Sequence, residues 1–75
     1  MNPSRHAIIL VVSSSHAIRA EHVLRQAGLE TKLMPVPRTL SSDCGVCVRI
    51  PAADVAKAEA ILEKHRVPYE EIVPM

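Results

Sequence analysis

Residues 6–28 read HAIILVVSSSHAIRAEHVLRQAG, and the prediction for the whole chain builds on this stretch. Its first seven residues, 6–12, are almost all apolar and mostly β-branched, which predicts a central strand. Three serines then supply helix-capping residues, and alanine and leucine recur at helical spacing behind them. Gly28 is a natural helix stop. The stretch therefore predicts a strand over 6–12 followed directly by a helix over Ser15–Ala27.

Shorter patterns predict the remaining elements. Residues 29–36 mix polar and apolar side chains and include Pro35, which cannot donate a ladder hydrogen bond and so suits an edge strand. Residues 46–50 alternate between apolar and other side chains, which indicates a strand with one buried face. A proline opens a second amphipathic helix over 51–65, and 67–73 supply a final strand.

The order of elements is therefore βαββαβ, and it predicts an α+β fold of one domain over residues 1–75. Two right-handed crossovers in so short a chain give a four-stranded antiparallel sheet with both helices on one face, a ferredoxin-like arrangement. In this arrangement the segment between the second and third strands lies at the same end of the sheet as the start of the first helix.

Composition excludes several classes of function. The 75 residues include no Trp, no Phe and one Tyr, so the aromatic platforms that stack on single-stranded nucleic acid are missing. The net charge of +1 is far below that of a protein that neutralises many phosphates. The amino terminus lacks the pattern of a signal peptide, and no apolar run is long enough to span a membrane. We therefore expect a soluble cytoplasmic protein that binds neither nucleic acid nor membrane.

A polar, turn-forming segment, Pro37–Gly45, separates the second and third predicted strands and carries Cys44. Buried structural cysteines usually lie within apolar runs, whereas this one follows two serines and an aspartate and precedes a glycine. The predicted topology brings it near the amino terminus of the first helix, whose dipole lowers the pKa of a thiol. Ser15, His16 and Arg38 are candidates for stabilising an anion there. Cys44 is therefore the leading candidate for chemistry.

Neighbouring residues each have two interpretations. Ser41 and Ser42 either donate hydrogen bonds to a thiolate or simply form the turn. Arg38 either orients an anionic group or is a loop charge. Cys47 has the strand parity opposite to Val48 and so points to the open face of the sheet, where it acts either as a resolving thiol or as a packing residue.

A redox or metal centre receives less support. A Cys-x-x-Cys redox pair normally starts a helix, whereas Cys44 and Cys47 lead into a strand. Two sulfurs need two further zinc ligands, and the four histidines have no paired spacing, so zinc would require a dimer that shares one site. We predict no metal site and no cofactor.

The run Pro37-Arg-Thr-Leu-Ser-Ser-Asp-Cys-Gly45 resembles the motif of the selenium/sulfur carrier-like family of small bacterial domains. The family pattern is Pro-Arg, any residue, an aliphatic residue, Ser-Ser, any residue and Cys-Gly. The serine-rich turn into a helix and the glycine that follows it, Gly28, are also similar. The resemblance implies that Cys44 holds a persulfide or selenide and that Gly45 belongs to the same site. Cys47 lies outside the motif.

These observations lead to a carrier that accepts sulfur or selenium on Cys44 from a donor protein and presents it to an acceptor protein. We therefore expect a carrier or accessory protein and not a stand-alone enzyme. The alternatives are a regulatory or interaction module that uses the sheet face, and a redox pair or zinc-linked dimer formed through Cys44 and Cys47. Because the strand over 6–12 is apolar on both sides, we also expect the open sheet face to expose aliphatic side chains that a homodimer would cover.

Overall fold

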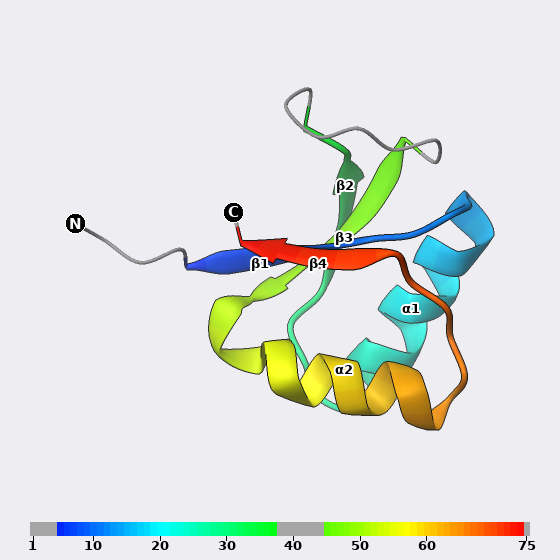
Figure 1. Ribbon diagram of the computed structural model, residues 1–75. Helices are drawn as coiled ribbons and strands as arrows, with labels where there is room; N and C mark the ends of the chain where they lie inside the picture. The colour runs from blue at the N-terminus through cyan, green and yellow to red at the C-terminus, as the bar shows by residue number, and fades with distance from the viewer. Residues whose placement is uncertain (1–4, 38–44, 75) are drawn as a thin grey trace.

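A computed structural model describes residues 5–37 and 45–74 of the chain. Four strands form one sheet, and two helices lie on the same side of it (Figure 1). In chain order the elements are β1 His6–Leu10, α1 Ser14–Gln26, β2 Lys32–Pro35, β3 Val46–Pro51, the short 3-10 helix η1 Ala52–Asp54, α2 Val55–Lys64 and β4 Glu71–Pro74. The strand order is β2-β3-β1-β4 with every neighbouring pair antiparallel, which confirms the predicted ferredoxin-like α+β arrangement.

Several element boundaries differ from the sequence-based prediction. Pro51 does not open the second helix but ends β3, where it pairs with His6, and a turn of 3-10 helix precedes α2. The last strand begins at Glu71 instead of residue 67, since Val67 is held by the carboxyl end of α2, where its N–H donates to the carbonyl of Leu62 at 2.9 Å. Pro51 suits the end of a strand as well as the start of a helix, because its φ of −62° occurs in both and neither position needs its missing N–H.

The first helix is shifted by one residue from its predicted span, and its ends follow the predicted capping residues. Ser13 is the N-cap residue, and at the other end Gly28 has a φ of +91°. The N–H of Gly28 donates to the carbonyl of Arg25, and the N–H of Leu29 to that of Leu24. These two bonds form a Schellman motif, which requires the left-handed backbone that glycine adopts without strain.

Alternate residues of β1 contribute to two apolar clusters on opposite faces of the sheet. Ala7 and Ile9 face the helices and pack in the larger cluster with residues such as Leu24 and Leu62. Ile8 and Leu10 face the open side of the sheet, where they form a second cluster with Cys47, Met34, Val36 and Val73. The expectation that β1 exposes aliphatic side chains on the open face is wrong, because Ile8 and Leu10 are only 1% and 5% exposed.

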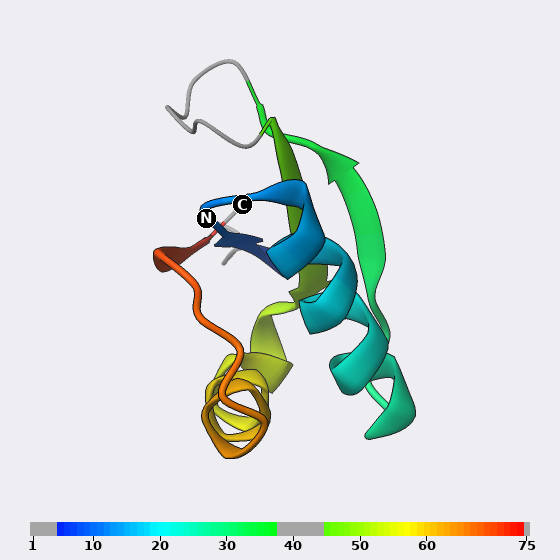
Figure 2. The ribbon, with the colours of Figure 1, turned by 90° about the vertical axis from the view of Figure 1, so that its right-hand side faces the viewer.

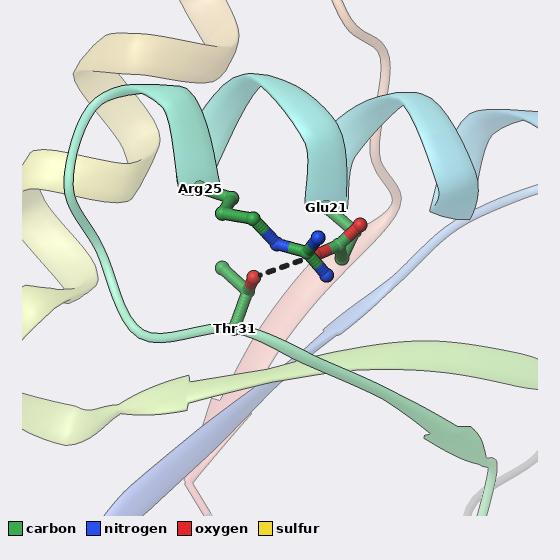
Figure 3. A network of polar contacts seen from close by, with 3 residues as sticks. All are labelled: Glu21, Arg25 and Thr31. Carbon is green, nitrogen blue, oxygen red and sulfur yellow. Dashed lines mark hydrogen bonds and ion pairs between the residues drawn. The ribbon is translucent and has the colours of Figure 1, made fainter.

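A largely buried carboxylate joins α1 to the segment that leads into β2 (Figure 3). Thr31 donates a hydrogen bond from Oγ1 to Glu21 Oε2 at 2.9 Å, and Arg25, one helical turn further along, forms an ion pair with the same oxygen. The Glu21 side chain is 10% exposed, whereas that of Arg25 is 71% exposed. Water can replace the exposed Arg25 side chain as a partner of the Glu21 carboxylate more readily than it can replace Thr31. The Thr31 hydroxyl is therefore the more important hydrogen-bond partner for stability.

We expect Thr31→Val to lower the free energy of unfolding by about 1–3 kcal/mol, because it leaves a buried carboxylate oxygen short of a hydrogen bond. The same substitution in a Glu21→Ala background should cost close to nothing. Urea unfolding of the four proteins of this double-mutant cycle measures the difference. An equal cost of Thr31→Val in both backgrounds would show that the hydrogen bond does not contribute.

Candidate functional site

The first turn of α1 carries no acidic side chain, and a serine caps its amino terminus. Ser13 has extended backbone angles, and its Oγ accepts the N–H of His16 at 3.4 Å while lying 3.2 Å from Nδ1 of the same histidine. The first turn contains no acidic residue. Ser14 and Ser15 are exposed and His16 is half-buried. The first turn of α1 therefore supplies no carboxylate to compensate the partial positive charge of this helix end.

Gly45 lies where the chain enters β3. Its φ is +77°, and a Cβ placed on it would contact nothing within 4 Å, so backbone conformation and not space accounts for the glycine. Its carbonyl accepts the N–H of Val36 at 3.0 Å, one residue beyond the last β2–β3 pair, Pro35 with Val46. This bond closes the base of the connection between the two strands.

The topology brings Gly45 and the start of α1 to the same end of the sheet, as predicted. β1 ends at Leu10, which pairs with Cys47 near the beginning of β3, and α1 begins four residues later. In Figure 2 the first turn of α1 (blue) lies beside β3 (lime green). Ser15 and His16 thus belong to the end of the molecule from which the β2–β3 connection departs.

Cys47 lies on the open face of the sheet, the face that its strand parity predicts. It is 0% exposed and stands in a cross-strand row between Leu10 and Met34. Its Sγ lies 3.9 Å from the carbonyl oxygen of Pro35. These contacts are those of a packing residue. Whether Cys47 also acts as a resolving thiol stays a prediction.

Four of the predicted site residues, Arg38, Ser41, Ser42 and Cys44, lie outside the described residues. Of the other predicted site residues, Ser15, His16 and Gly45 lie at the end of the sheet where β3 begins. Within residues 5–37 and 45–74 no group of three or more His, Cys, Asp or Glu side chains is arranged to hold a metal ion.

The open face also carries a pair of cations that no local sequence pattern indicates. Lys32 of β2 and Arg49 of β3 are directly opposite in the register. They are 17 residues apart in the chain, and only the strand register reveals that they are neighbours. His6 of β1 lies on the same face, diagonal to Arg49.

Comparison with protein families gives one match, and it covers all the helices and strands described above. A family model described as "Putative Se/S carrier protein-like" matches residues 6–74. The chain belongs to this family. The match spans every helix and strand, so it covers the fold as well as the segment with the Cys-Gly motif. The Se/S carrier-like family name refers to sulfur and selenium transfer, which implies protein partners.

Other comparisons add no relative. Neither the curated proteins nor the solved structures include a match to this Se/S carrier-like chain.

No helix among the described residues is long and apolar enough to cross a membrane.

Proposed function

We propose that this Se/S carrier-like domain holds a sulfur or selenium atom on Cys44 between a donor and an acceptor protein. The observation that carries the proposal is the family match over residues 6–74, together with a Cys44 that directly precedes Gly45 in the sequence. The thiolate would attack the outer sulfur of a persulfide on the donor protein. The cysteine of the donor leaves as a thiolate, and the product is a Cys44 persulfide. The step consumes no oxidant.

The amino terminus of α1 supports an anionic product. A persulfide is an anion at neutral pH, and the uncompensated end of α1 lies at the end of the sheet where β3 begins. Ser15 would supply its backbone N–H and His16 its ring, since the backbone N–H of His16 already donates to Ser13. Arg38, Ser41 and Ser42 would act from the segment that carries the cysteine.

The alternatives receive less support from the described residues. A zinc-linked dimer through both cysteines needs an accessible Cys47, which is 0% exposed. A homodimer or scaffold that uses the open sheet face would need uncovered aliphatic side chains, and Ile8 and Leu10 are buried. A regulatory interaction module that does not use the thiol is the remaining rival.

The pH dependence of Cys44 alkylation distinguishes the carrier from that rival. In a Cys47→Ala variant Cys44 is the only thiol, and its alkylation rate follows the thiolate fraction. We expect the midpoint in the folded protein to lie clearly below the ordinary thiol pKa of about 8.5. The same variant in denaturant is the control. Equal midpoints in the folded and denatured protein would favour the interaction module.

A further inference from the structure

A small pocket at the opposite end of the open face is lined by charged side chains that the proposed carrier function does not use. It encloses about 210 Å³ between the starts of β1 and β2 and the end of β3. The lining residues are His6, Glu30, Thr31, Lys32, Arg49, Ile50 and Pro51. Arg49 is four residues from Gly45 along β3, a separation of about 13 Å in a strand. The pocket is therefore separate from the Cys44 end of the sheet.

Strand register places two cations of this pocket side by side. Lys32 of β2 is directly opposite Arg49 of β3, and Arg49 is directly opposite Ile8 of β1. The three residues therefore form one row across the same face of the sheet. Directly opposite side chains have Cβ atoms about 4.5–5.5 Å apart, and two like charges in that position destabilise a sheet. His6, two residues before Ile8, occupies the diagonal position next to Arg49 on the same face.

The two cations lack anionic partners among the described residues. Neither Lys32 nor Arg49 makes an ion pair or a side-chain hydrogen bond within residues 5–37 and 45–74. Glu30 lines the same pocket but is exposed and forms no ion pair with either cation. The hydroxyl of Thr31 is already used as the donor to Glu21. Arg49 is half-buried, so its guanidinium, which has no anionic partner in the described part of the chain, is partly withdrawn from water.

We propose that this pocket binds a tetrahedral oxyanion of the phosphate or sulfate type. Arginine presents a planar set of donors that fits two oxygens of such an anion, and lysine adds a point charge beside it. A dianion between Lys32 and Arg49 would turn their mutual repulsion into two attractions. The volume corresponds to about seven waters, and ligand pockets for drug-sized molecules begin near 300 Å³. The pocket therefore has room for one oxyanion group with a few waters.

Titration with inorganic phosphate and with sodium sulfate tests the proposal. Amide chemical shifts of the ¹⁵N-labelled protein, recorded at constant ionic strength in chloride at pH 7.5, should change in a saturable manner around residues 6, 32 and 49. Arg49→Gln and Lys32→Gln should each weaken binding at least tenfold. Lys64→Gln, which removes an exposed lysine from the last turn of α2, is the charge-matched control and should bind as the wild type does.

Two further arms make the outcome decisive. Sodium acetate should bind at least tenfold more weakly than sulfate, and equal or tighter binding of acetate would show that the pocket does not prefer tetrahedral oxyanions and would overturn the assignment. In chloride alone, Lys32→Gln should raise the melting temperature or leave it unchanged, since it removes the repulsion from Arg49. Non-saturable shifts, or equal affinity in the wild type and in both pocket variants, would also refute the site. None of these measurements involves Cys44.

Discussion

Leu24→Ala is expected to remove a large part of the stability of this domain. Leu24 is 0% exposed and packs in the cluster between the helices and the sheet. Truncating a buried leucine to alanine typically costs about 2–5 kcal/mol, because the loss of apolar burial is joined by an unfilled cavity. A domain of 75 residues has a total stability of about 4–11 kcal/mol at the usual 0.05–0.15 kcal/mol per residue. The variant should therefore lose from about a fifth of that stability to all of it.

Leu33→Ala is the matched control for this prediction. It makes the same chemical change in β2, at an edge of the sheet, where the leucine is 38% exposed. We expect a cost of about 1 kcal/mol or less, since little apolar surface is lost there. Urea and thermal unfolding followed by circular dichroism measure both variants. Equal losses in the two would contradict the packing described for α1 against the sheet.

Cys47 should be protected from alkylation by at least about 10³-fold relative to the denatured protein. It is 0% exposed and lies in β3, which is paired on both sides, so a reagent reaches it only when the strand opens. Opening a central strand costs a free energy close to that of global unfolding, and each 1.4 kcal/mol slows labelling tenfold.

The measurement uses a Cys44→Ser variant, in which Cys47 is the only thiol. Intact-protein mass spectra after timed exposure to iodoacetamide give the labelling rate, and the same variant in urea gives the reference. Labelling within tenfold of the urea rate would mean that Cys47 is accessible in the native protein, and would restore the resolving-thiol interpretation. Strong protection would leave packing as its function.

Local sequence patterns predicted the elements that depend on local chemistry. The serine cap, the helical spacing of alanine and leucine, and Gly28 together define α1 to within one residue at each end. Strict alternation in β3 correctly places Val48 toward the helices and Cys47 on the open face. These features need only the immediate neighbours of a residue, so one sequence is sufficient to predict them.

Features that depend on contacts distant in the chain were missed. The burial of Glu21 against Thr31 was missed, because helical periodicity shows its i,i+4 neighbour Arg25 but not where a later segment will pack. The juxtaposition of Lys32 with Arg49 depends on the β2–β3 register, which the length of the intervening connection does not fix. The burial of Ile8 depends on side chains from neighbouring strands, so the apolar pattern of β1 alone predicted exposure incorrectly.

The central claim is that Cys44 carries the transferred atom, and intact-protein mass spectrometry tests it most directly. The wild type, Cys44→Ser and Cys47→Ala are each incubated with a cysteine desulfurase and either cysteine or selenocysteine, without reductant. We predict a gain of one sulfur or one selenium atom, reversed by a thiol reductant, in the wild type and in Cys47→Ala but not in Cys44→Ser. Equal loading of Cys44→Ser, or no loading of the wild type with either substrate, would contradict the carrier function.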